Sequence, residues 1–121
     1  MHDQQFRFQG LTIWQRAADV SGPPFRLADN LERRRLFRFA EQLRGATMSI
    51  TNNIAEGAAS VSAVEFAQFL NIARRSVFEV ANILILLVRH GWCDPGEPSP
   101  LLSELEEESR MILALRRTLK S

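Results

Sequence analysis

The chain has 121 residues, of which 45% are hydrophobic and 24% are charged, with 15 basic and 14 acidic side chains and a formal net charge of +1. A chain of this length can bury a core without disulfides or metals and is expected to form one domain. Its balanced charge excludes overall electrostatic attraction to nucleic acid or to an anionic membrane, so any basic surface must be local.

Cellular location is indicated by what the sequence lacks. The single Cys93 excludes an internal disulfide, and the N-terminus has no basic segment that leads into an apolar one, which together favour a cytoplasmic protein. The longest apolar run, residues 83–88, is far shorter than the roughly 20 residues of a membrane span, so no membrane association is expected. Residues 1–10 are assigned to an N-terminal tail and residues 11–121 to a single domain.

The first helix is predicted over residues 11–20, where apolar side chains recur at helical spacing. Gly22-Pro23-Pro24 interrupts this pattern, because the prolines remove two amide donors and restrict the residues before them. Pro24 can occupy the first turn of a new segment. The sequence therefore predicts two helical pieces on one line, with a bend between them.

The second helix is predicted to begin near residue 29, because Asp29-Asn30-Leu31-Glu32 has the spacing of a capping box. Gly57 is predicted to end this helix as a left-handed residue just beyond its last turn. Gly45, in the middle of the helix, is interpreted as a place where another helix comes close, because glycine there otherwise only costs stability.

The third helix is predicted from the capping box Ser62-Ala63-Val64-Glu65 to His90, with its end at Gly91. The fourth helix is predicted to be capped by Ser99, with acidic residues early and basic residues late, as the helix dipole prefers. Four helices with short connections predict an all-α fold, an antiparallel up-down-up-down four-helix bundle whose first helix is broken at residues 22–24.

The third helix carries more apolar surface than one bundle seam uses. Beyond its core stripe, apolar residues lie on two flanks, and both flanks are candidates for an oligomer interface. They are Ile72, Ile83 and Leu86 on one flank and Phe78 and Ile85 on the other. This excess predicts a neighbouring subunit and hence a homo-oligomer.

Six arginines are candidates for contact with RNA or DNA. Arg33, Arg34, Arg35 and Arg38 place four cations at the predicted start of the second helix, the unfavourable end of its dipole, and this cost favours an anionic partner. Binding to a nucleic-acid backbone would depend on salt. Arg74 and Arg75 on the third helix are the further candidates. The alternative is a solvated charged face that also pairs with the acids of the fourth helix.

A polar cluster is predicted where the second helix ends. Glu56 lies in the last turn, at the negative end of the dipole, and so requires a cation or hydrogen-bond donors. Asn53 on the apolar face likewise needs partners if it is buried. We expect a structural cluster that fixes helix register or a subunit contact, formed by Ser49, Asn53, Glu56, Arg44 and Arg75. The alternative is that Glu56 is a ligand-binding or catalytic carboxylate.

Motifs of catalysis and of metal or cofactor binding are mostly absent from the sequence. His2 lies in the predicted tail, and His90 has no second ligand one helical turn away. All six glycines are isolated, so no glycine-rich phosphate loop is present, and Cys93 has no base near it in sequence. We therefore expect a protein that is not an enzyme, with no catalytic residue, no metal and no cofactor.

Four segments of the chain together resemble a known protein family. They are Leu11-Thr12-Ile13-Trp14-Gln15-Arg16-Ala17, Gln42-Leu43-Arg44, Ser49-Ile50-x-x-Asn53-Ile54-Ala55-Glu56-Gly57 and Glu65-Phe66-x-x-Phe69-Leu70-x-Ile72-Ala73-x-x-Ser76. The family consists of four-helix-bundle proteins first identified as open reading frames within intervening sequences of bacterial 23S ribosomal RNA genes. The resemblance extends from Leu11 to the end of the fourth helix.

The resemblance implies a ring-like homopentamer whose biochemical role is unsettled. Similar bundles are accessory proteins of diversity-generating retroelements, where they bind nucleic acid and a reverse transcriptase, although those proteins are strongly basic and this chain is not. The chain departs from the family pattern at Gly22-Pro23-Pro24, where the family usually continues its first helix. It also has Ala58-Ala59-Ser60 where the family often carries an arginine.

Overall fold

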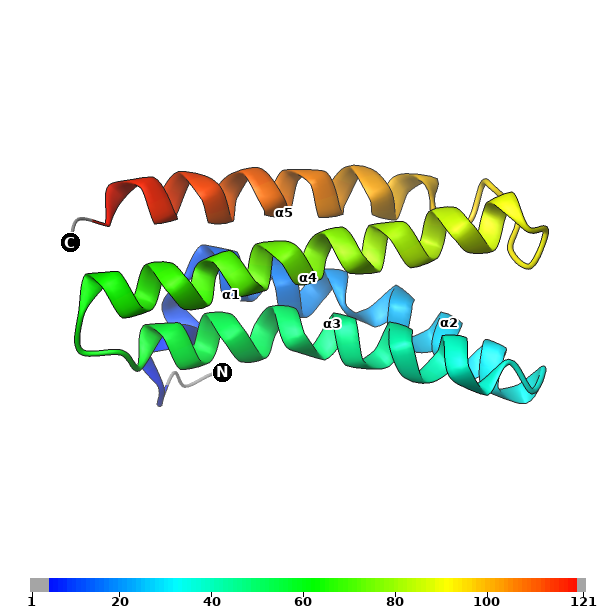
Figure 1. Cartoon of the computed structure of the whole chain (residues 1–121), viewed down its shortest axis with the longest axis horizontal. Helices are drawn as coiled ribbons and strands as arrows, with labels where there is room; N and C mark the ends of the chain where they lie inside the picture. The colour runs from blue at the N-terminus through cyan, green and yellow to red at the C-terminus, as the bar shows by residue number, and fades with distance from the viewer. Residues whose placement is uncertain (1–4, 120–121) are drawn as a thin grey trace.

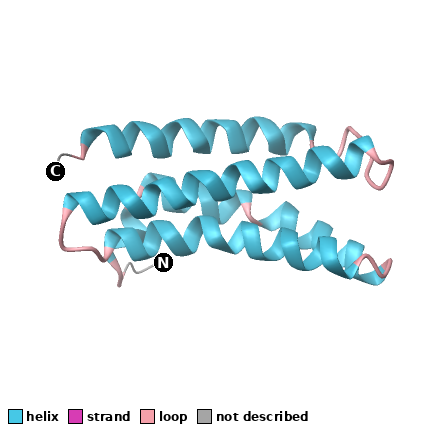
Figure 2. Cartoon of the chain, in the orientation of Figure 1, coloured by secondary structure: helices cyan, strands magenta, loops and turns pink. Residues whose placement is uncertain are grey.

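The computed structural model describes residues 5–119, so that His2 lies outside the described residues. Within this range every regular element is helical, and short loops connect the elements (Figure 2). In chain order they are η1 (Arg7–Gly10, a 3₁₀ helix), α1 (Thr12–Val20), α2 (Gly22–Arg33), α3 (Phe37–Ala58), α4 (Ala63–Arg89) and α5 (Ser99–Thr118). None of the described helices combines the length and the apolar character that crossing a membrane requires.

The elements form a four-helix bundle in which α1 and α2 together make the first arm. Figure 1 shows α3, α4 and α5 as long neighbouring rods that alternate in direction, with α1 and α2 behind them. Helix α4 packs against both α3 and α5, while α2 packs on α3 and α1 contacts α5 and α3. The predicted all-α four-helix architecture is therefore confirmed.

The predicted break in the first arm is present at Ser21. Its amide and its hydroxyl both donate to the carbonyl of Ala17, at 3.0 and 2.7 Å, and its own carbonyl accepts from the amide of Phe25 at 3.1 Å. Pro23 and Pro24 fall in the first turn of α2, where the amides would have no partner within the helix. The chain thus bends while its backbone hydrogen bonds continue almost without a gap.

The predicted start of the second helix near residue 29 is wrong. Residues 29–32 lie in the last turns of α2, and the long helix α3 begins only at Phe37. The carboxylates of Asp29 and Glu32 do not cap a helix, because both bind the guanidinium of Arg44, each at 2.6 Å. A capping-box spacing therefore marked a pair of acids that join α2 to α3.

The interpretations of two glycines also change. Gly57 does not end α3 in a left-handed conformation, since the helix continues to Ala58. A Cβ at Gly57 would lie 2.8 Å from Cδ1 of Phe66 and 2.8 Å from Cβ of Phe69, so glycine lets α4 approach α3 closely. At Gly45 a Cβ would meet nothing within 4 Å beyond its own helix backbone, so none of the described helices uses the space.

Both ends of α4 agree with the prediction. The Ser62 side chain accepts a hydrogen bond from the amide of Glu65 at 3.1 Å, and Gly91 follows the helix with φ of +78°. The start of α5 differs by one residue, because Pro98 is the cap and Ser99 is already helical.

The core is a continuous set of aliphatic side chains contributed by every arm. Its largest fully buried members are Leu31, Leu43, Ile54, Leu70, Leu84, Leu87, Leu105 and Ile112. Residues 7–10, assigned to the tail from the sequence, form η1 and pack onto this core. The ring of Phe8 lies 5.1 Å from that of Trp14, and Arg7 Nη1 donates to the carbonyl of Ala58 at 3.2 Å.

The contrast between the two helical glycines can be measured. We expect Gly57→Ala to lower the free energy of unfolding by about 1–3 kcal/mol, because the new methyl forces α4 away from α3. Gly45→Ala should raise it by roughly 0.5–1 kcal/mol, because alanine favours a helix and has room. Urea unfolding followed by circular dichroism measures both changes. A Gly57→Ala variant as stable as the wild type would contradict the close approach.

Candidate functional site

The turn between α2 and α3 brings four of the six candidate arginines together. The amide of Leu36 donates to the carbonyl of Leu31, and that of Arg35 to the carbonyl of Glu32, both at 2.9 Å. These two bonds form a Schellman motif. In this motif the residue just beyond the C-cap of the helix takes a left-handed conformation and is usually glycine. Arg35 occupies this position with φ of +63°, a conformation that costs an L-residue roughly 1–2 kcal/mol.

The side chains of this turn point to solvent. Arg33, Arg34, Arg35 and Arg38 are all exposed, as is Phe37 between them, and we call these five residues the arginine turn. Arg34 Nη1 donates to the carbonyl of Trp92 at 2.9 Å. Among residues 5–119, Arg33, Arg35 and Arg38 form no ion pair. The pairing with acids of the last helix, which the alternative interpretation included, is thus not found among the described residues.

The arginine turn lies at the same end of the bundle as the C-terminus of α4 (Figure 1). Trp92 makes the contact between the two ends. Its ring centroid lies 4.8 Å from that of Phe39, in an edge arrangement, and 5.9 Å from that of His90. Arg89 and His90 are exposed beside it. The end of the bundle therefore gathers cations from two helix termini.

The other two candidate arginines are elsewhere. Arg74 and Arg75 lie in the middle of α4, about 20 Å along the helix from Arg89. The guanidinium carbon of Arg74 stacks 5.1 Å above the ring of Phe78, and its buried Nε has no hydrogen-bond partner among the described residues. The six arginines thus form two separate groups and not one surface.

The structure brings together only part of the predicted polar cluster. Asn53 Nδ2 donates to the carbonyl and hydroxyl of Ser49 at 2.8 and 2.9 Å, and Ser49 Oγ is hydrogen-bonded to Ser76 Oγ at 2.8 Å across the α3–α4 seam. Glu56 is exposed and forms no ion pair with Arg44 or Arg75, the two arginines of the predicted cluster. The Asp29 and Glu32 carboxylates bind Arg44 instead and raise its pKa above the ordinary value.

The apolar residues predicted to flank α4 are exposed with one exception. Ile72 is 44%, Phe78 57%, Ile85 49% and Leu86 37% exposed. Ile83 belongs to the core of its own chain and is buried, so its assignment to an interface is wrong. The remaining four residues form a first flank, Ile72 and Leu86, and a second flank, Phe78 and Ile85.

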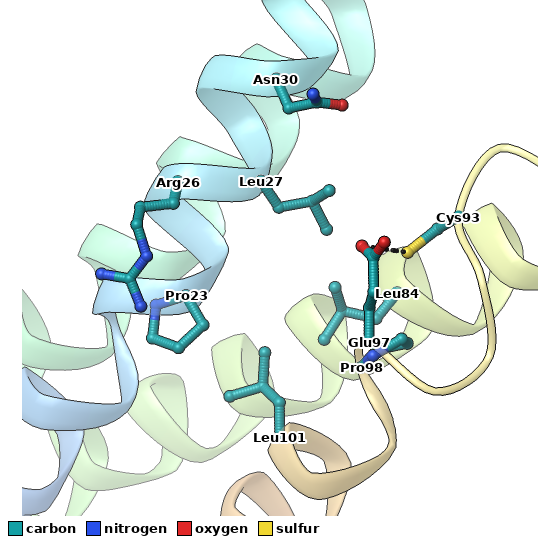
Figure 3. Close-up of a pocket in the computed structure, with 9 residues that line it drawn as sticks. All are labelled: Pro23, Arg26, Leu27, Asn30, Leu84, Cys93, Glu97, Pro98 and Leu101. Atoms are coloured by element: carbon teal, nitrogen blue, oxygen red, sulfur yellow. Dashed lines mark hydrogen bonds between the residues drawn. The ribbon is translucent and has the colours of Figure 1, made fainter.

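A cleft of about 310 Å³ lies between α2 and the loop that precedes α5 (Figure 3). Leu27, Leu84 and Leu101 line it, and Cys93 Sγ donates to a carboxylate oxygen of Glu97 at 3.5 Å. Burial, with the Glu97 hydrogen bond adding to it, raises the pKa of the Cys93 thiol to about 11. The thiol therefore stays protonated at neutral pH and is not an activated nucleophile.

Residues 5–119 contain no group of three or more His, Cys, Asp or Glu side chains that could hold a metal ion. The geometry of the described residues thus offers two surfaces, the arginine turn and the apolar flanks of α4.

Comparison with known proteins identifies the family. The sequence profile described as "23S rRNA-intervening sequence protein" matches residues 9–114. The chain belongs to this 23S rRNA-intervening sequence protein family. A comparison with curated proteins gives no match. The matched region includes η1 from residue 9 on, all of α1 to α4 and α5 as far as residue 114, so the family match covers nearly the whole bundle.

One residue of this family member escaped the sequence interpretation. Glu108 in α5 is 0% exposed, and neither carboxylate oxygen has a hydrogen-bond partner among the described residues. Its nearest cation is Arg16 of α1, with Nε 3.8 Å from Oε1, and the same guanidinium faces Glu104 and Glu107 at 3.4 and 3.8 Å. The sequence did contain a signal for this burial. Glu108 occupies a position of the apolar stripe of α5, three residues after Leu105 and four before Ile112.

Burial raises the pKa of Glu108 to about 7, and the positive charge of Arg16 offsets only part of this effect. Because the folded-state pKa lies above the ordinary value of 4.5, folding favours the protonated acid. The free energy of unfolding should therefore fall as pH rises from about 4.5 through about 7, by at most roughly 3 kcal/mol from this group.

Glu108→Gln should remove this contribution, because the amide keeps the shape of the protonated acid without its ionisation. We expect the variant to match the wild type near pH 4, below the unfolded-state pKa, and to exceed its thermal midpoint at pH 8, measured by calorimetry. Glu106→Gln is the matched control, since Glu106 is exposed on the same helix and pairs with Arg110 at 3.1 Å. Equal pH profiles for the wild type and Glu108→Gln would contradict the raised pKa.

Proposed function

We propose that this protein is a non-enzymatic, homo-oligomeric scaffold that presents its bundle in a ring, with the pentamer implied by the family resemblance as the expected size. The observation that carries this proposal is the exposure of four large apolar side chains along one helix, Ile72, Phe78, Ile85 and Leu86. Water contact with these side chains is unfavourable, and because about half of each is already covered, burial of the rest would contribute roughly 1 kcal/mol per side chain.

The placement of the two flanks favours a ring. Ile72 and Leu86 are 14 residues apart and Phe78 and Ile85 are 7 apart, so each pair lies on one side of α4. The two sides are separated by about 110° around the helix axis. One flank of a subunit can then contact the other flank of its neighbour, and such head-to-tail contacts form a ring when the rotation from one subunit to the next closes.

The second flank is hollowed and apolar, as a surface that receives a partner would be. Phe78 lines a groove between α4 and α5 together with Ala81 and Leu102, and Ile85 and Val88 line a second hollow that shares Leu102 with the first. Arg74 covers one face of the Phe78 ring while its Nε lacks a partner among the described residues. A neighbouring subunit that fills the groove would bury the exposed part of the Phe78 ring.

Light scattering coupled to gel filtration tests the assembly. We expect the wild type to run as a single oligomer at micromolar concentration and Phe78→Asp or Ile85→Asp to run as folded monomers, because a buried carboxylate opposes association. Val61→Asp is the control, since Val61 is fully exposed in the α3–α4 loop, away from both flanks. A monomeric wild type would refute the scaffold proposal.

A second candidate function is contact with RNA or DNA through the arginine turn. It is supported by the exposure of Arg33, Arg35 and Arg38 without an ion pair among the described residues. Such side chains are free to neutralise phosphates. The uncapped N-terminus of α3, which begins within the turn and has no acid in its first turn, adds partial positive charge there.

Filter binding of an RNA hairpin across a salt series tests this second function. We expect affinity at low salt that falls as salt rises, and a slope of log K against log salt that is shallower by about 2 in the Arg33→Gln/Arg38→Gln variant. Arg110→Gln is the control, because Arg110 lies on α5 and is paired with Glu106. Absence of affinity for the hairpin at 50 mM salt would remove this function.

A further inference from the structure

The arginine turn contains an aromatic side chain that the core leaves out. Phe37 is the first residue of α3 and is 56% exposed, whereas its neighbours Leu36 and Phe39 pack against the core. It stands between Arg35 and Arg38 in the sequence, and all three side chains are exposed on the same turn. A π surface among cations is the combination that proteins use to bind single strands, on which bases stack while phosphates are neutralised.

The backbone of the turn indicates that the side chain of Arg35 is retained against a local preference. Helix α4 ends at the same end of the bundle with the same two hydrogen bonds, from Gly91 to Val88 at 3.0 Å and from Trp92 to Leu87 at 2.8 Å. There the left-handed position is held by glycine, with φ of +78°, and in α2 it is held by Arg35 with φ of +63°. Glycine would suit both positions, so the arginine is not explained by folding.

We propose that the arginine turn binds single-stranded nucleic acid, with phosphates on Arg33, Arg35 and Arg38 and an unpaired base stacked on Phe37. This inference rests on the nucleic-acid function proposed above and specifies its ligand. A duplex offers phosphates to the arginines, but its bases are stacked inside the helix and leave no free face for Phe37. A single strand offers both, so it gains a contact that a duplex lacks.

The position of Arg34 adds to this arrangement. Its guanidinium is held on the carbonyl of Trp92, which joins the turn to the C-terminus of α4 and fixes the turn on the bundle. Arg33, Arg35 and Arg38 remain unpaired among the described residues and project from a turn whose backbone is closed by hydrogen bonds. The ligand therefore meets a backbone fixed by hydrogen bonds and exposed cationic side chains that are not committed to an ion pair among the described residues.

Fluorescence anisotropy with a labelled 12-nucleotide oligouridine and a labelled 12-base-pair RNA duplex, at the same salt, tests the proposal. The wild type should bind the single strand at least severalfold more tightly than the duplex. Phe37→Ala should weaken single-strand binding about tenfold and leave duplex binding unchanged, while Phe37→Trp should retain it. Phe6→Ala is the control, because Phe6 is exposed next to η1, which Arg7 ties to the other end of α3.

Arg35→Gly provides a second readout that loss of folding cannot produce. Its thermal midpoint should rise by a few degrees, because glycine relieves the left-handed strain, while its affinity for oligouridine falls about threefold or more.

Three results overturn the inference. If Phe37→Ala binds oligouridine like the wild type while Arg33→Gln/Arg38→Gln does not, nucleic-acid binding stands without stacking. Equal affinity for oligouridine and for the duplex would also show that stacking on Phe37 does not contribute. If the protein binds neither ligand, the nucleic-acid function proposed above is refuted as well.

Discussion

The packing of α4 between α3 and α5 is the contact on which the rest of the structure depends. Gly57 sets the distance on one side, because Phe66 and Phe69 occupy the space that a Cβ would need. The Ser49–Ser76 hydrogen bond then fixes how α3 and α4 are aligned along their seam. With one face of α4 so committed to the core, its outer apolar side chains cannot be buried within the chain, and this is what leaves two flanks exposed.

The end of the bundle that carries the arginine turn shows how helix termini can create a surface. Helices α2 and α4 both finish there with Schellman motifs, and cations near their C-termini are favourable to both dipoles. Arg33 and Arg34 thus lie at the end of a helix, not at the start that the sequence suggested. The dipole argument for an anionic partner therefore no longer applies to them. What supports such a partner is the exposure of the arginines and the glycine-like position of Arg35.

The polar groups that are buried in the structure are not the ones that the sequence predicted to be buried. Glu56 lies in residues 49–57, one of the segments that carry the family resemblance, but it is exposed, while Ser49 and Gly57 of that segment make the structural contacts. The buried carboxylate is Glu108, which joins α5 to α1 through Arg16. Burial raises the pKa of Glu108 to about 7, so the contact between α5 and α1 is expected to weaken as this acid ionises.

The sequence by itself determined the helical bundle, the break before Pro23 and the limits of α4, because apolar periodicity, proline and the Ser62 and Gly91 caps act locally. The tertiary structure decided the rest. Whether Asp29 and Glu32 cap a helix or bind Arg44 depends on a residue a dozen positions away, and whether Gly57 ends a helix or admits Phe66 depends on the partner helix. Exposure of Phe37 and burial of Glu108 are likewise set by packing between arms, which spacing along one helix cannot specify.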